Sequence, residues 1–206
     1  MLRIFINSGH HLKDSGFVCN CGLAHGKEAE WNMKIRDEVK KLLPNAQYVP
    51  DELDLKATIE WINSRATNND FALDIHLNSN VNTAFTGTEA YYTETPRYAD
   101  IFAKEISKSL GIFNRGSKHD SLTFVGSLGF LRKTICPSVV LECLYLTNSS
   151  DRKTLESGGT EKIARGIKSG LDILFPTLPQ DTKKIIISLQ QQILNLISRI
   201  LALLTK

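Results

Sequence analysis

The sequence has no run of 18 uninterrupted apolar residues, so we expect no membrane-spanning helix. Its four cysteines in 206 residues are too few for a disulfide framework. The chain opens with a strand-like segment, Leu2–Ile6, and no apolar h-region precedes it, so we also expect no secretory signal peptide. Charge is nearly balanced, since 25 basic residues stand against 22 acidic ones. This balance argues against a nucleic-acid interface.

The small charge excess lies entirely in the tail. Residues 181–206 carry four basic side chains and one acidic one, a net charge of +3, and the preceding residues are neutral as a whole. Pro176 and Pro179 mark a boundary just before this segment. The sequence therefore predicts a folded domain over residues 1–177, followed by a linker and an amphipathic helix over residues 178–206.

Within the first domain, short apolar runs alternate with segments of helical periodicity. This alternation predicts an α/β fold, a single domain in which helices flank a mostly parallel, twisted sheet. The expected strands are Leu2–Ile6, Ala46–Val49, Phe71–Leu77, Glu89–Tyr92 and Ser138–Leu146. The expected helices are Glu28–Leu43, Leu55–Ala66, Arg97–Leu110 and Lys162–Leu174.

Histidines follow or end two of these strands. His10 and His11 come directly after the first strand, and His76 lies at the end of another. The carboxyl ends of parallel strands meet at one edge of a sheet, where ligands bind. Two histidines with a carboxylate and an open fourth position are typical of a catalytic zinc site, and Glu28 is a candidate third ligand. Equally, each histidine could be an ordinary loop residue, and Glu28 could serve only the helix dipole.

Two other features have a functional and a plain interpretation. Glu142 lies in an otherwise apolar strand, where a carboxylate is costly to bury unless it is paired, although an edge strand could expose it to water. Cys19 and Cys21 form a C-x-C pair that could bind metal, but no second pair of suitable spacing exists. We therefore expect four reduced thiols, with Cys136 and Cys143 in the core.

Four segments, in order along the chain, resemble motifs of the zinc-dependent N-acetylmuramoyl-L-alanine amidases of the amidase-3 family. The family patterns are D-P-G-H-G-G-x-D-x-G, E-x-x-x-N, S-I-H-A-N and P-x-V-L-V-E-x-G-F-x-S-N. They are similar to residues Asn7–Gly16, Gly26–Asn32, Ala72–Asn78 and Pro137–Asn148. A fifth pattern, G-x-E-x-Y-Y, matches the segment from Gly87 to Tyr92. The resemblance covers roughly residues 2–175.

This resemblance implies roles for individual residues. Zn²⁺ would be held by His10, Glu28 and His76, and Glu142 would take a proton from the attacking water and pass it to the leaving amine. The implied substrate is peptidoglycan, cut between the lactyl group of N-acetylmuramic acid and L-alanine of the stem peptide. Arg132, just before the Glu142 strand, is a candidate for contacting the stem peptide, although a plain surface role explains it as well.

The chain also departs from the family pattern. Asn7 and Ser8 replace Asp-Pro, so a supporting carboxylate is missing at that position. His11 replaces a glycine beside the expected ligand His10. Two other functions remain open: a zinc peptidase acting within the stem peptide, and a catalytically inactive wall-binding module. We expect synthesis in the cytoplasm and action on the cell wall after release, as for a phage lysin or a mother-cell lytic enzyme.

The resemblance does not extend to the tail. Six apolar residues there follow a 3-4-3-4-3 spacing, with isoleucine and leucine alternating as in the a and d positions of a coiled coil: Ile186, Leu189, Ile193, Leu196, Ile200 and Leu203. A second apolar row widens this face. The pattern favours a homo-oligomer formed through residues 183–204. Docking on the chain's own domain and binding to a membrane surface are the alternatives.

Overall fold

The computed structural model describes residues 2–11, 27–176 and 180–204. The chain divides into two units, Met1–Leu174 and Phe175–Lys206. Among the described residues, the first unit holds every strand and the second holds the helix α7 (Gln180–Leu204).

The described residues of the first unit form a six-stranded sheet in the order β2-β1-β3-β6-β4-β5. Pairing is parallel except between β4 and β6, which are antiparallel. The strands are β1 (Ile4–Ser8), β2 (Gln47–Tyr48), β3 (Phe71–Asn78), β4 (Thr88–Tyr92), β5 (Asn114–His119) and β6 (Ser138–Tyr145). The predicted α/β fold with a mostly parallel sheet is confirmed.

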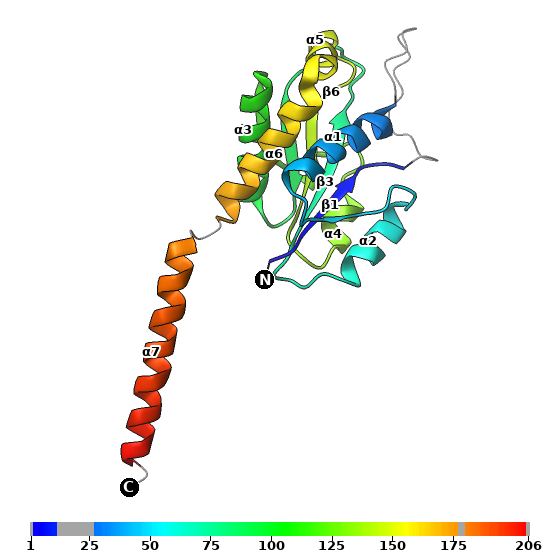
Figure 1. The fold of residues 1–206 in the computed structure, drawn as a ribbon. Coiled ribbons are helices and arrows are strands. Elements are labelled where there is room, and N and C mark those ends of the chain that lie inside the picture. Colours follow the sequence, from blue (N-terminus) through cyan, green and yellow to red (C-terminus); the bar gives the residue numbers. More distant parts are fainter. Residues whose placement is uncertain (1, 12–26, 177–179, 205–206) are drawn as a thin grey trace. The chain divides into compact units, whose positions relative to one another are not determined.

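Helices surround this sheet (Figure 1). They are α1 (Glu28–Leu42), α2 (Leu55–Asn63), α3 (Pro96–Leu110), α4 (Gly129–Lys133), α5 (Ser149–Thr154) and α6 (Thr160–Leu174), with a short 3₁₀ helix at Asp120–Leu122 and a π-helical segment at Leu155–Gly159. Capping residues define the ends of some of these helices. Asp54 caps α2 by accepting a bond from the backbone N–H of Ala57, and Gly111 ends α3 in the left-handed conformation.

Alternate side chains of the central strands face opposite sides of the sheet. On one side, Phe5, Ala72 and Val140 pack in a cluster with Ile62 of α2 and Phe130 of α4. The other side is covered by α1, α3 and α6, which lie together in Figure 1. Glycine permits this close packing, because a Cβ atom at Gly166 of α6 would lie 2.6 Å from the Cα atom of Ile106 in α3. The two faces are therefore different, and residues of the first face line the candidate site, to which α1 adds Glu28 from its first turn.

The structure extends the sequence-based assignment at a few points. The strand β5 and the short helices α4 and α5 were not predicted. For β5 the reason is its sequence, Asn-Arg-Gly-Ser-Lys-His, which has no apolar residue to signal a strand. Cys136 and Cys143 are buried free thiols, as predicted. Cys19 and Cys21 lie outside the described residues.

The predicted amphipathic helix of the tail is present as α7. None of the described helices combines the length and the apolar character needed to cross a bilayer.

Candidate metal centre and active site

His10, Glu28 and His76 meet at the carboxyl ends of β1 and β3. One ligand atom from each lies within 4.8 Å of those of the other two. Glu28 Oε2 is 3.3 Å from Nε2 of His10, and Glu28 Oε1 is 3.0 Å from Nδ1 of His76. Two imidazoles and one carboxylate at this spacing could hold a metal ion, and they are residue types that zinc sites use.

The loop after β1 is shaped to place His10. The backbone N–H of Gly9 bonds to the carbonyl of Ile75, and the side chain of Asn32 in α1 donates to the carbonyl of Gly9. His10 itself has a φ of 65°, a left-handed conformation that is uncommon outside glycine. A Cβ atom at Gly9 would lie 2.2 Å from Nε2 of His76. Only glycine at this position lets the two histidine segments approach so closely.

Glu28 is the charged centre of this group. Burial would raise its pKa, but hydrogen bonds and attraction to His10 and His76 hold the pKa well below its usual value. For His76, burial would lower the pKa, but Asp74 and Glu28 raise it well above the usual value. The carboxylate of Glu28 is therefore ionised, which is the form in which a carboxylate can act as a metal ligand.

Glu142 lies beside these three residues on β6, directly opposite His76 of β3. Its Oε2 atom is buried and has no hydrogen-bond partner among the described residues. Burial raises the pKa of Glu142 to about 8; His76 opposes this shift, and the carboxylates of Glu28 and Glu89 add to it. An unsatisfied carboxyl oxygen with a pKa near neutrality is suited to exchanging protons with a reactant.

A second buried carboxylate, Glu89 on β4, lies on the other side of Glu142 in the sheet. It accepts hydrogen bonds from Tyr91, Arg115 and Lys118. Burial would raise the pKa of Glu89, but hydrogen bonds from Lys118, Tyr91 and Arg115 outweigh this effect and hold the pKa below its usual value. Glu89 is thus a fixed negative charge, whereas no salt bridge to Glu142 is present in the part of the chain that the structure describes.

A cavity of about 210 Å³ opens over these groups. One part of its wall is polar and contains both histidines of the loop, and the other part is apolar. The lining residues are Asn7, His10, His11, Leu53, Leu55, Thr58, Asp74, His76, Leu128, Gly129, Phe130, Val140 and Glu142. The structure therefore brings Glu142 and the two predicted histidine ligands to one cavity. His11 lines the same cavity but does not belong to the three-residue cluster.

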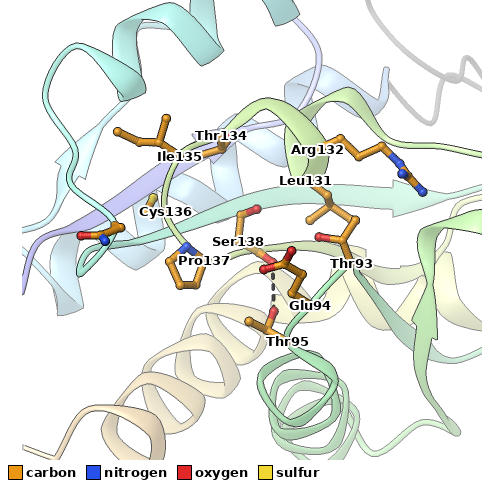
Figure 2. A pocket seen from close by; sticks show the side chains of 11 residues that line it. Thr93, Glu94, Thr95, Leu131, Arg132, Thr134, Ile135, Cys136, Pro137 and Ser138 are labelled. Carbon is orange, nitrogen blue, oxygen red and sulfur yellow. Dashed lines mark hydrogen bonds between the residues drawn. The ribbon is translucent and has the colours of Figure 1, made fainter.

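Arg132 does not line this cavity. It lines a second cavity, of about 540 Å³, together with residues such as Glu94 and Ser138. Figure 2 shows its guanidinium group pointing away from Pro137 and Ser138. That group makes two hydrogen bonds of 2.7 Å to the buried carboxylate of Asp120. Its predicted contact with substrate stays a prediction.

One residue of the site was not singled out from the sequence. Asp74 lies two residues before His76 on the same face of β3, and its Oδ2 atom is 3.1 Å from Nε2 of His76. The sequence could have pointed to Asp74, because it is a carboxylate at a position where the matched pattern S-I-H-A-N has serine.

The comparison with family models agrees with this geometry. Residues 4–172 match the model of the amidase-3 family, N-acetylmuramoyl-L-alanine amidase. The chain belongs to this amidase family. The matched range includes His10, Glu28, His76 and Glu142.

Individual relatives are consistent with this family. The chain is 30% identical over 179 residues to the N-acetylmuramoyl-L-alanine amidase LytC of Bacillus subtilis, a match that covers 81% of this chain and 34% of LytC. The chain thus spans about a third of the length of that relative. It is also 29% identical over 187 residues to the B. subtilis protein YqiI, covering 84% of each.

Solved structures show the same fold. The catalytic domain of CwlV, an N-acetylmuramoyl-L-alanine amidase from Bacillus (Paenibacillus) polymyxa, superposes with a TM-score of 0.72 at 27% identity, covering 84% of this chain and 98% of that domain. The amidase AmiC2 of Nostoc punctiforme gives 0.71 at 27% identity, covering 84% and 97%. The residues that match the family model, 4–172, all lie within the first unit.

Proposed function

We propose that this amidase-family chain is a zinc-dependent peptidoglycan hydrolase. It would cut the amide bond between the lactyl group of N-acetylmuramic acid and L-alanine of the stem peptide. One observation carries the proposal: His10, Glu28 and His76 converge on one point, and beside them lies Oε2 of Glu142, which has no hydrogen-bond partner among the described residues. The family match and the similarity to LytC support the same reaction.

The donor set fits zinc. Imidazole nitrogen and carboxylate oxygen are ligands that zinc accepts, and three protein ligands leave a position for a reactant. The described part of the chain offers such a group at this one place. When bound, the ion would supply Lewis-acid polarisation of the scissile carbonyl and a lowered pKa for water.

The chain's own residues would do the rest. Glu142 would accept a proton from the attacking water at Oε2 and return it to the nitrogen of the leaving alanine. Glu142 lies between its register partners His76 and Glu89 in the sheet. The apolar side chains of Leu53, Leu55, Leu128 and Phe130 line the same cavity and would limit the access of bulk water. A general base is most effective when its pKa lies near the working pH, and the buried position of Glu142 favours this.

Product analysis tests the proposal. Purified peptidoglycan is digested with the full-length protein, with and without a chelator, and the fragments are identified by mass spectrometry. The expected products are stem peptides with a free alanine amine and glycan strands with a free lactyl carboxylate. A new carboxylate within the stem peptide would instead indicate a zinc peptidase. Binding to the wall without any cleavage would indicate an inactive module.

We also propose that α7 joins copies of this chain. Its apolar residues Leu189, Ile193 and Leu196 are exposed, and they keep the regular 3-4 spacing of a coiled-coil seam. Isoleucine at a and leucine at d favours two strands, and the second apolar row would suit a small bundle. A membrane surface fits less well, because residues 180–204 contain no aromatic residue and the polar face is mostly glutamine, serine and asparagine.

Joined copies would bind a polymeric wall multivalently. The phage-lysin role and the place of synthesis expected from the sequence stay predictions.

A further inference from the structure

Asn7 and Asp74 are paired across the strands β1 and β3. They are register partners in the parallel ladder, so both side chains are on the face that carries the metal cluster. Asn7 donates from Nδ2 to Oδ1 of Asp74 over 2.7 Å, and both residues are buried. The other oxygen of Asp74, Oδ2, lies 3.1 Å from Nε2 of His76. One carboxylate therefore connects the two strands and reaches the imidazole.

This pair reverses the arrangement of the matched family patterns. Those patterns have aspartate at the position of Asn7, in D-P-G-H, and serine at the position of Asp74, in S-I-H-A-N. Here the carboxylate is on β3 and its uncharged partner is on β1. The chain thus keeps one carboxylate in the pair, and the supporting carboxylate that the sequence of β1 lacks is present on the neighbouring strand.

We propose that Asp74 is a positioning residue for His76. Its carboxylate, on β3, replaces the carboxylate that the family pattern has on β1. The inference rests on the proposed function, because it assigns His76 as a metal ligand. The Nδ1 atom of His76 faces Glu28, and Nε2 faces Asp74. An imidazole that donates its second N–H to a carboxylate has a fixed tautomer and ring orientation, and its free nitrogen is a better ligand.

The packing around His76 restricts the orientation of its imidazole ring. Gly9 lies against the edge of the ring that contains Nε2, since a Cβ atom there would lie 2.2 Å from that nitrogen and 2.3 Å from Cε1. Asp74 is itself held by Asn7, which can only donate to it through Nδ2. The acceptor for Nε2–H is therefore preorganised before any metal binds.

Three full-length variants test this. D74S places the family's serine at position 74 and removes the carboxylate. N7D/D74S restores the family arrangement, with the carboxylate on β1. D70S is the matched control, because Asp70 is also buried next to β3 but bonds to Arg3, away from the site. The readouts are zinc affinity by competition with a chromophoric chelator, and the unfolding temperature of the metal-free protein.

We expect D74S to bind zinc about 10–100-fold more weakly than the wild type, N7D/D74S to regain most of this loss, and D70S to keep wild-type affinity while losing stability. The isosteric variant D74N keeps the shape of the side chain and should also weaken zinc binding, which provides a second measurement if D74S does not fold.

Zinc affinity of D74S and D74N within about a factor of two of the wild type would overturn the positioning role. Failure of N7D/D74S to bind more tightly than D74S would overturn the exchange between strands. Both results are independent of the cleavage products, so an altered zinc affinity without amidase activity would refute only the proposed function. A wild-type chain that binds no zinc would overturn both.

Discussion

His76 on β3 and Glu142 on β6 are register partners in a parallel ladder, so their side chains lie side by side on one face of the sheet. The first belongs to the cluster that fits a metal ion, and the second has a buried oxygen without a partner among the described residues. The proposed ligand and the proposed proton acceptor are thus held together by backbone pairing. The separation between them is set by the sheet and does not depend on a loop.

The first prediction concerns Glu142. E142Q should keep the fold and the bound zinc but lose about 10²–10⁴-fold in turnover, because an amide has the shape of the carboxyl group but cannot accept the proton. Turnover on purified peptidoglycan measures the loss. The exposed Glu60 of α2 provides the control E60Q, which should behave as the wild type. An E142Q protein that retains more than about a third of the activity would contradict the assignment.

The second prediction concerns the ligands. The full-length protein should bind one zinc ion per chain, and His10→Ala and His76→Ala should each lose it, because an incomplete ligand set binds weakly. His11→Ala is the control, since His11 lines the cavity but is not in the cluster. Elemental analysis of the purified variants decides this. An empty site in His11→Ala together with a filled site in His10→Ala would show that the motif is matched one residue out of register.

The third prediction is a pH dependence of stability. Burial would raise the pKa of Asp120, but the guanidinium group of Arg132 and the backbone N–H of Leu128 hold it below its usual value. A carboxyl whose pKa is lower in the folded state stabilises the protein above its unfolded pKa of about 3.9, and this stabilisation is lost as the pH falls through the folded pKa. D120N should therefore lower the free energy of unfolding at pH 7, by about 1.5–3 kcal/mol, and by less as the pH falls below about 4.

Denaturant titrations of the wild type and D120N between neutral and acid pH measure this difference. D100N, at an exposed position on α3, is the control and should differ little from the wild type at any pH. An equal effect of D120N at neutral and acid pH would contradict the ionic role of Asp120. The result also concerns the site, because the bond from Leu128 fastens the segment that lines the cavity.

The fourth prediction concerns α7. I193Q/L196Q should convert an oligomer into a monomer, because glutamine removes two seam residues and still favours a helix. Light scattering on the full chain at tens of micromolar measures the mass. Q191A/S198A, on the polar face, is the control and should keep the oligomer. A monomeric wild type would refute self-association, as would an I193Q/L196Q variant of unchanged mass.

The sequence by itself determined the α/β class and most elements to within a few residues, and through its resemblance to the family it predicted the set His10, Glu28, His76 and Glu142. It could do so because apolar periodicity is a local property. The patterns around these residues are also contiguous in the chain. Buried strands such as β3 and β6 are apolar enough to be recognised without knowing their neighbours.

The tertiary structure alone decided what depends on pairing between strands. The polar strand β5 exists because it pairs with β4, and its basic residues Arg115 and Lys118 neutralise the buried Glu89. The bond of Asp74 to Asn7 depends on the register of β1 with β3, since these residues are 67 positions apart in the chain. Such contacts arise from the order and register of strands in the sheet, which no single stretch of sequence contains.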